Sequence, residues 1–402
     1  MERLHIEEPV IILLLGTLLI AFLLVTAGAR RVRIPSLIGY ILLGFLVRLI
    51  DRDGTILTTP VLSVLDVLGK IGVIALLFRI GLESDLRGLI GKLRSAALIW
   101  IVSVVGSGLA GFAAARYLLG RPTIPSLFVG IALTATSVGV SLGVWTESGR
   151  NRSPTGELLL DVVELDDISG VILMAILFGV SPLFAQGAGA LGPLPIVQTV
   201  ATVLAKLALF LLICWIFLKY LERPFTRLVT RAERAPQPML TMVGVTFVIA
   251  ALAGLLGFSV AIGAFFAGII FSQDRDAVKM EASFESIYAF FTPFFFIWIG
   301  ISLTPGAILG SAGTGGVLLI AAVAGKFLFS WLPALPVTSF RDASLIGTSM
   351  IPRAEISMII MHQGLRDEAI GVGEELFGGM LLVVLVTCIA VPLILRRLMR
   401  QR

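Results

Sequence analysis

The sequence predicts an all-α polytopic membrane protein, and three observations lead to that class. Of the 402 residues, 57% are hydrophobic and only 14% are charged, and the mean hydropathy is +1.02. A soluble domain carries about 25% charged residues. The apolar residues fall into repeated runs of about 20, the length that spans a ~30 Å hydrocarbon layer. The basic residues gather in alternate connections between these runs.

The apolar runs predict about 13 transmembrane helices. The first run is too long, and is followed too directly by further runs, to be a cleaved signal peptide. The predicted helices lie at residues 8–28, 34–50, 61–82, 95–118, 124–147, 156–180, 194–219, 238–256, 258–273, 284–304, 315–335, 342–364 and 374–396.

The connections indicate the orientation, because Lys and Arg concentrate on the cytoplasmic side of a membrane. One set of alternate connections holds 20 basic residues, and the opposite set holds 5. This bias predicts a bacterial-type inner-membrane protein with its N-terminus outside and its C-terminus in the cytoplasm. It also accounts for the net charge of +5, so we expect no binding to nucleic acid.

Six basic residues lie within the predicted spans, where a charge at mid-bilayer costs about 2.5–3.5 kcal/mol. Arg48 and Arg79 lie near helix ends and can snorkel to the interface. Lys70 follows Asp66 by four residues, so the two can pair on one helix face. The remaining three basic residues are costly charges within the membrane: Lys206, Lys326 and Arg353. For Lys206, snorkelling or a structural pair is the alternative to a functional role.

The helix predicted at 156–180 carries the most informative acidic residues. Asp166 and Asp167 lie about 15 Å beyond Glu157 at ~1.5 Å rise per residue, which is the middle of a ~30 Å core. Adjacent residues point about 100° apart, so one carboxylate can face a cavity while the other faces a packed helix. Three further acids lie progressively nearer the cytoplasmic end: Glu157, Asp161 and Glu164. They can line an inward funnel, or they can belong to a solvated helix entrance.

Two other predicted helices are interrupted at the same depth. Residues 124–147 contain the hydroxyl-rich segment Thr134-Ala-Thr136-Ser137, and residues 342–364 contain Pro352-Arg353-Ala-Glu355. Proline removes a backbone donor and breaks a helix, and broken backbone at this depth lines a cavity or is buried in protein. We therefore expect two antiparallel broken helices to meet at the midplane, with Arg353 and Glu355 compensating their partial charges.

The predicted helices also divide into two halves of six, joined by the helix at 194–219 and its basic tail at 223–234. One linking helix between two even-numbered halves makes the halves inverted with respect to the membrane. Inverted repeats with discontinuous helices at the midplane are typical of secondary transporters that work by alternating access.

Five short segments together resemble the monovalent cation:proton antiporter superfamily, in the branch that contains NapA-type sodium/proton and Kef-type potassium/proton exchangers. The resemblance covers essentially the whole chain. The segments, in order, are Gly81-Leu-Glu83, Thr134-Ala-Thr-Ser137, Glu164-Leu-Asp-Asp167, Ile262-Gly-Ala-Phe-Phe-Ala-Gly268 and Ile351-Pro-Arg-Ala-Glu355.

This resemblance implies a NhaA-type fold with two inverted six-helix repeats and two crossing broken helices, usually in a homodimer within the lipid bilayer. Its dimerisation domain corresponds to residues 1–94 and 238–306, and its core domain to 95–182 and 307–402. Residues 183–237 hold the linking helix and the basic loop. The implied activity is exchange of Na⁺ or Li⁺ for protons, in the service of pH homeostasis, without a cofactor.

The resemblance also implies roles for individual residues. Asp167 matches the carboxylate that takes either the cation or a proton, Asp166 matches its neighbour in sodium exchangers, and Lys326 matches the lysine that pairs with that neighbour. Competition between cation and proton at Asp167 then forces exchange. Sodium prefers oxygen ligands, which the carboxylates, freed carbonyls and the hydroxyls of Thr136 or Ser137 offer.

Some features depart from the family pattern or leave alternatives open. Arg79 and Trp298-Ile299 replace the residues that are commoner there, which affects selectivity rather than class. No Gly-rich nucleotide-binding domain is expected in the chain, so a Kef-type potassium/proton antiporter without that domain is the alternative. A cation channel fits less well because the chain shows no filter-like repeat. An organic-anion symporter would be expected to have fewer acids opposite a lysine. A membrane enzyme fits least, because no nucleophile–base set is found. Cys214 and Cys388 are expected to be packing residues.

Overall fold

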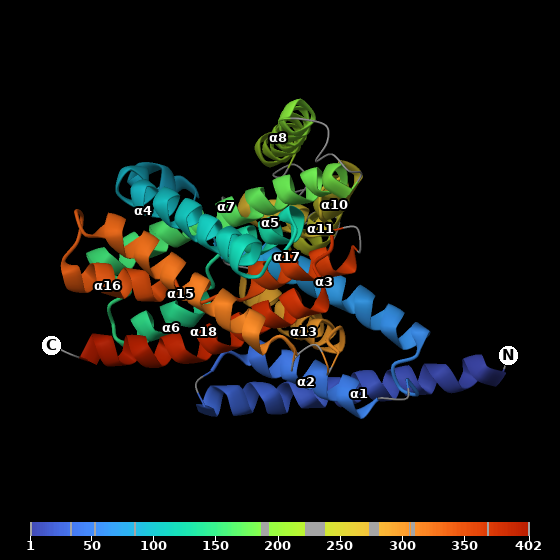
Figure 1. Ribbon diagram of the computed structural model, residues 1–402. Helices are drawn as coiled ribbons and strands as arrows, with labels where there is room; N and C mark the ends of the chain where they lie inside the picture. The colour runs from blue at the N-terminus through green and yellow to red at the C-terminus, as the bar shows by residue number, and fades with distance from the viewer. Residues whose placement is uncertain are drawn as a thin grey trace. The chain divides into compact units, whose positions relative to one another are not determined.

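The computed structural model describes residues 2–32, 34–51, 54–83, 86–185, 193–221, 238–272, 281–304, 306, 310–367 and 370–400. Within these ranges every regular element is a helix and no strand occurs (Figure 1). This confirms the all-α class. Six of the described helices are long and apolar enough to cross a membrane.

The chain divides into two compact units, each assembled from distant parts of the sequence. The first unit holds residues 1–83, 212–255 and 259–305, and the second holds residues 84–211, 256–258 and 306–402. Each unit therefore combines an N-terminal with a C-terminal segment.

Among the described residues, the first unit contains six α-helices and the short π-helix η3 (Phe217–Leu221). The predicted run at 8–28 is longer in the structure, as α1, and Pro9 lies within it. Helix α3 packs along α11, and α13 packs along both α2 and α3. The six helices are α1 (Glu2–Val32), α2 (Ser36–Ile50), α3 (Thr59–Glu83), α10 (Pro238–Leu255), α11 (Val260–Ser272) and α13 (Glu281–Ile301).

Glycines allow the helices of the first unit to approach closely. A Cβ added to Gly44 would overlap the backbone of Ile297 on α13, and one added to Gly300 would overlap Ile41 on α2. The same reciprocal arrangement joins α3 and α11, where Gly81 lies on the carbonyl of Phe265 and Gly268 lies on that of Phe78. Small residues at such crossings permit the close backbone packing that replaces a hydrophobic driving force in membranes.

The second unit contains the interrupted helices. Helix α15 packs against α4 and α18, and α4 also packs against α5 and α7. Most of α8 (Pro193–Ile216) belongs to this unit as well. The remaining elements are α4 (Leu86–Ala113), the π-helix η1 (Ala114–Leu118), α5 (Thr123–Ala132), α6 (Val138–Glu147), α7 (Pro154–Ala185), α15 (Ala312–Ala334), α16 (Phe340–Ser349), α17 (Glu355–Arg366) and α18 (Glu374–Arg400).

Both predicted interruptions occur in the structure. The run at 124–147 forms α5 and α6 with non-helical backbone between them, and the run at 342–364 forms α16 and α17 in the same way. Ser137 at the first break has extended backbone with φ −94° and ψ 96°. The hydroxyl-rich segment and Pro352 thus mark the breaks correctly.

Several other expectations can be compared with the structure, and some lie outside the described residues. Lys70 and Asp66 pair at 2.6 Å, as their spacing predicted. Arg79 does more than snorkel, because it forms ion pairs with Glu83 and Glu285. The basic loop at 223–234 lies outside the described residues. The same holds for five of the basic residues counted in the other connections: Arg33, Arg52, Arg275, Lys279 and Arg402.

Candidate functional site

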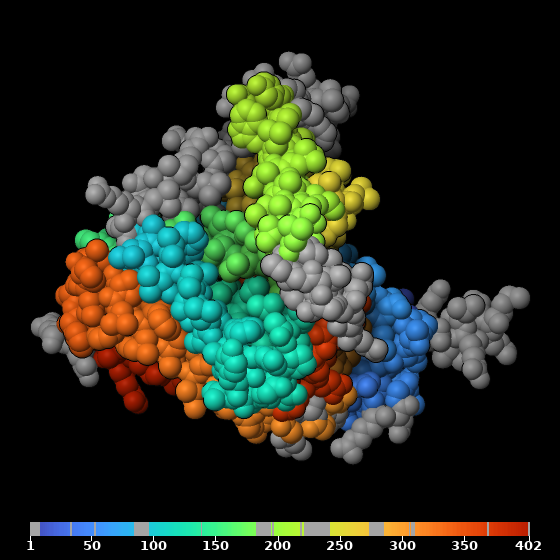
Figure 2. All heavy atoms as spheres, turned by 45° about the horizontal axis from the view of Figure 1, so that its top comes forward, coloured from blue at the N-terminus to red at the C-terminus, as the bar shows by residue number. Residues whose placement is uncertain are grey.

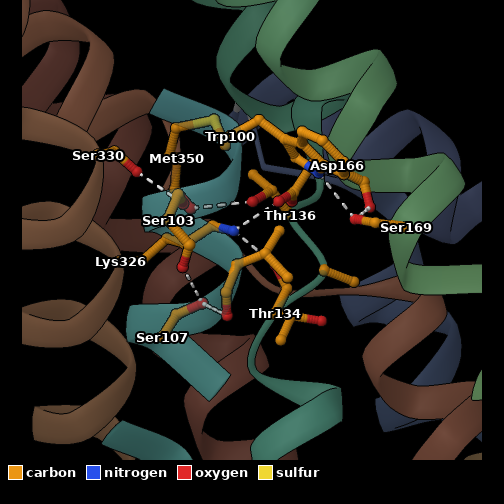
Figure 3. Close-up of polar contacts among 12 residues, drawn as sticks. Trp100, Ser103, Ser107, Thr134, Thr136, Asp166, Ser169, Lys326, Ser330 and Met350 are labelled. Atoms are coloured by element: carbon orange, nitrogen blue, oxygen red, sulfur yellow. Dashed lines mark hydrogen bonds and ion pairs between the residues drawn. The ribbon is translucent and has the colours of Figure 1, made fainter. Parts of the chain in front are cut away.

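A buried ion pair joins two helices at the centre of the second unit. The Nζ of Lys326 on α15 donates to Asp166 Oδ1 on α7 at 2.8 Å, and also to the carbonyl oxygen of Thr134 at 2.5 Å (Figure 3). Both charged side chains are fully buried, at 0% exposure. Removing an ion from water costs several kcal/mol even after relaxation, so this pair is tolerated only because each charge neutralises the other.

Asp167 differs from its neighbour in environment. Asp166 is 1% exposed, whereas Asp167 is partly exposed. Within the described part of the chain, the Asp167 carboxylate forms no hydrogen bond or ion pair. The ~100° step between adjacent helical residues accounts for this difference, because the two side chains leave α7 in different directions. Asp167 is thus a carboxylate near the buried pair with its own oxygens free to bind a small ion or a proton.

The two interrupted helices meet at their breaks and satisfy each other's backbone. The N–H of Ser137 donates to the carbonyl of Pro352 at 2.9 Å, and the Ser141 hydroxyl donates to the carbonyl of Ser349 at 2.8 Å. The Thr136 hydroxyl also donates to the carbonyl of Met350, at 3.3 Å. Each break therefore supplies hydrogen-bond partners that the other lost when its helix ended.

Arg353 compensates the C-terminal ends of α5 and α16. It is 0% exposed, and its Nη1 donates to the carbonyls of Ala135 and Met350 at 2.9 and 3.2 Å. The same nitrogen donates to the Thr136 hydroxyl at 3.2 Å. Carbonyls at a helix C-terminus carry partial negative charge, so a cation among them is favourable. Its Nε and Nη2 have no hydrogen-bond partner among the described residues.

Glu355 occupies the opposite kind of helix end. It is the first residue of α17, and its Oε2 accepts a hydrogen bond of 2.9 Å from Ser137, the residue that precedes α6. Helix N-termini carry partial positive charge and favour a carboxylate. The structure thus places a cation at the two C-terminal ends of the breaks and an anion at the two N-terminal ends.

A layer of hydroxyl groups that sequence reasoning missed supports these residues. Ser330, one helical turn beyond Lys326, donates to Ser103 on α4 at 2.9 Å. Ser169, which follows Asp166 by three residues, accepts from the Trp100 indole at 3.0 Å and donates to the Asp166 carbonyl. Their spacing of three or four residues from the predicted charges is the signal that would have found them.

The remaining predicted residues lie nearer the surface. Glu157 is exposed in the first turn of α7, and Asp161 and Glu164 are half-buried further along that helix. Lys206 is exposed on α8 and belongs to no part of the site. Cys214 and Cys388 are both buried, and the Cys388 thiol also contacts the carbonyl oxygen of Arg353 at 3.1 Å.

The described helices define a polytopic membrane protein that buries charged side chains where two interrupted helices meet. Its family follows from the sequence as a whole. Residues 18–401 match the model of the sodium/hydrogen exchanger transmembrane family, and the chain belongs to that family.

Individual relatives agree with this membership. The chain is 29% identical to the high-affinity Na(+)/H(+) antiporter NhaS3 of Synechocystis, over 82% of this chain and 70% of that protein. It is 28% identical to the Na(+)/H(+) antiporter of Enterococcus hirae, over 95% and 97% of the two chains. In fold it is similar to the sodium proton antiporter MjNhaP1 of Methanocaldococcus jannaschii, with a TM-score of 0.68, 16% identity, and coverage of 98% and 99%.

Proposed function

We propose that this protein is a secondary antiporter that exchanges Na⁺ or Li⁺ for protons across a bacterial-type inner membrane. The family membership and the names of the two curated relatives support the class of activity. The finer proposal is that cation and proton compete for one carboxylate, Asp167, and that the site is exposed to each side in turn by elevator-type alternating access.

The observation that carries this proposal is the contrast between two adjacent aspartates. Asp166 is committed to Lys326 by a 2.8 Å ion pair, whereas Asp167 is partly exposed and holds no ion pair within the described chain. A negative carboxylate that forms no ion pair and has the acids Asp166 and Glu355 nearby needs a counter-charge. Either a proton or a small cation supplies it, and the presence of one excludes the other. This competition is sufficient for obligatory exchange.

The groups around Asp167 suit a hard monovalent cation. Such ions prefer oxygen ligands, and the breaks offer the hydroxyls of Thr136 and Ser137 together with freed backbone carbonyls. We infer that Asp166 joins the cation shell when Lys326 gives up its proton. Two protons are then exchanged for each cation. The half-buried acids Asp161 and Glu164 line the proposed path from the cytoplasmic side to Asp167.

The glycine crossings of the first unit support the proposed inverted repeats. In each crossing, a glycine lies on the carbonyl of the residue three positions before the partner helix's glycine. In the proposed repeats, α2 corresponds to α11 and α3 corresponds to α13. The α2–α13 crossing therefore corresponds to the α11–α3 crossing, and each glycine of one crossing has a counterpart in the other. The four contacts are Gly44 on Ile297, Gly300 on Ile41, Gly81 on Phe265 and Gly268 on Phe78.

The division of the chain supports distinct roles for its parts. We assign residues 1–94 and 238–306 to a dimerisation domain, and residues 95–182 and 307–402 to a core domain that carries the site. The compact units divide after residues 83 and 305, close to these boundaries. Helix α1 exposes many apolar side chains, including Ile12 and Leu13 at 70% each, which is consistent with a homodimer contact.

Ion flux in proteoliposomes tests the assignment of Asp167. We expect Asp167→Asn to abolish Na⁺-driven proton movement, because the amide can neither release a proton nor neutralise a cation. The matched control is Glu147→Gln, which removes a carboxylate at the end of α6 that is exposed and lies away from the breaks. An Asp167→Asn protein that still exchanges Na⁺ for protons would overturn the assignment.

Replacing the external cation tests the identity of the transported ion. We expect exchange with Na⁺ and Li⁺ and much weaker exchange with K⁺. Preferred exchange of K⁺ would instead establish the potassium/proton alternative, and cation flux that persists without any proton counter-flux would establish a channel. In Lys326→Gln, undiminished charge movement per cation would contradict the two-proton stoichiometry.

A further inference from the structure

An apolar groove runs along the surface of the second unit between α4 with its terminal π-helix η1 and α15. Its volume is about 460 Å³, and its lining residues include Ala110, Ala114, Tyr117, Ala321, Ala324 and Phe329. Figure 2 shows α4 in cyan beside α15 in orange on one face. No charged side chain lines the groove.

Small residues and the π-helix together create this groove. Gly325 lies in its floor, and a Cβ added there would come within 3.0 Å of the Ala110 Cβ, so α15 and α4 pack closely at this point. Above the floor, alanines leave space that longer side chains would fill. Larger and highly exposed side chains form the rim, with Tyr117 at 76%, Leu118 at 73% and Ile320 at 70% exposure.

The dimensions of the groove fit a lipid acyl chain. The lining residues of α15 extend from Val317 to Phe329, which at ~1.5 Å per residue is about 18 Å. One leaflet of a ~30 Å hydrocarbon core is about 15 Å deep. The groove is therefore as long as one leaflet, is apolar throughout, and is open along its side, as a chain entering from the bilayer requires.

The π-helix that lines one end of the groove also carries a basic residue. Arg116 is exposed within η1, between the lining residues Ala114 and Tyr117. Its Nη1 donates to the carbonyl of Arg121 at 3.0 Å, and no carboxylate forms an ion pair with it in the described part of the chain. Tyr117 beside it is the kind of residue that lies at headgroup level in membranes. An exposed guanidinium there is complementary to a phosphate.

We propose that this groove binds an anionic phospholipid, with one acyl chain between α4 and α15 and the headgroup phosphate on Arg116. The site lies behind the ion pair, because Gly325 faces the groove while the adjacent Lys326 faces Asp166. A bound chain packs on the α4–α15 contact that holds Lys326 and Ser330 in place. The proposal does not depend on which ion the protein transports.

Photo-crosslinking of the full-length protein in liposomes tests this site. The probes are phosphatidylglycerol and phosphatidylcholine carrying a diazirine on the acyl chain, and the labelled peptides are identified by mass spectrometry. We expect residues 110–118 and 317–329 to be labelled about fivefold more by the anionic probe, the factor for one basic residue near an anionic headgroup.

Two variants with matched controls complete the test. Ala324→Phe fills the groove and should abolish labelling of these residues, whereas Ala205→Phe, on an exposed alanine of α8, should leave it unchanged. Arg116→Gln should equalise the two probes, whereas Arg48→Gln, at the end of α2, should keep the anionic preference.

Equal labelling of the groove by both probes in the unmodified protein would overturn the proposal, since it would indicate general contact with bulk lipid. Labelling that is unaffected by Ala324→Phe would also overturn it.

Discussion

In the first compact unit glycines bring helix backbones together at two crossings, whereas the second unit also buries charged side chains in its core. The first unit joins α2 to α13 and α3 to α11 through backbone-on-backbone contacts, and its ion pairs lie at partly exposed positions such as Arg79. The second unit buries Lys326, Asp166 and Arg353 within its core. The first unit is therefore held mainly by shape, whereas the second depends on compensation of charge as well. The second unit carries Asp166 and Asp167, the carboxylates to which we assign the exchange of ions.

Breaking the buried ion pair should give the largest effect on stability. Lys326→Met leaves the Asp166 carboxylate without its partner, and removing one member of a buried pair costs about 3–5 kcal/mol. The double variant Lys326→Met with Asp166→Asn should recover part of this loss, since no unpaired charge remains. Melting temperatures of the detergent-purified proteins provide the measurement. A double variant no more stable than the single one would contradict the role of compensation.

The first unit should instead be sensitive to added volume. We expect Gly81→Ala to destabilise the protein by about 1–3 kcal/mol, because its Cβ overlaps the carbonyl of Phe265. Gly244→Ala on α10 is the control, since a Cβ there meets nothing within 4 Å. The melting temperatures of the two variants provide the measurement. Equal melting temperatures would show that the α3–α11 crossing has room for an added Cβ.

Asp51 is a polar exception within the first unit. It is 3% exposed and follows α2. Burial acts to raise its pKa, but hydrogen bonds from the N–H groups of Ile56 and Leu57 outweigh burial and hold the pKa below its ordinary value. A carboxyl group of this kind adds stability above its unfolded pKa of about 3.9, and that contribution is lost as the pH falls through the folded value.

We therefore expect Asp51→Asn to cost about 1 kcal/mol, because the amide oxygen keeps only part of these hydrogen bonds. The difference in melting temperature from the unmodified protein should be constant between pH 8 and pH 5 and should shrink below about pH 4. A difference that grows on acidification would contradict this assignment of the charged form.

The exposed ion pairs of the first unit should matter least. Arg79 contacts Glu83 at 2.7 Å and Glu285 at 3.1 Å, and lies over the Tyr288 ring, but it remains 28% exposed. Exposed pairs contribute about 0.2–1 kcal/mol and are screened by salt. Arg79→Met should lower the melting temperature slightly in dilute buffer and not at high salt. A large loss that is independent of salt would mean that this cluster acts as a buried network.

How much of this was predictable from sequence differs between backbone and side chains. The helical class and both interruptions follow from hydropathy, from Pro352 and from the hydroxyls near Thr136, because these features act locally. The contacts of Arg353 with Ala135 and Thr136 do not, since these residues lie 218 and 217 positions away in the chain and one of the acceptors is a backbone carbonyl, which every residue has. Likewise the Ser103–Ser330 bond depends on the facing of α4 and α15, which periodicity alone leaves open.

The mutual pairing of the two breaks has a consequence for how the chain is made. Thr136 and Met350, which form one of its hydrogen bonds, are 214 residues apart along the chain. At about 5–20 residues per second, the ribosome needs about 10–40 s to supply the second segment after the first has entered the membrane. During that interval the first break lacks its partners on Met350, Pro352 and Glu355, and exposed backbone in lipid costs several kcal/mol per group. Helices α5 and α6 must therefore begin as one continuous helix, or wait beside water or an insertion factor, until the second half arrives.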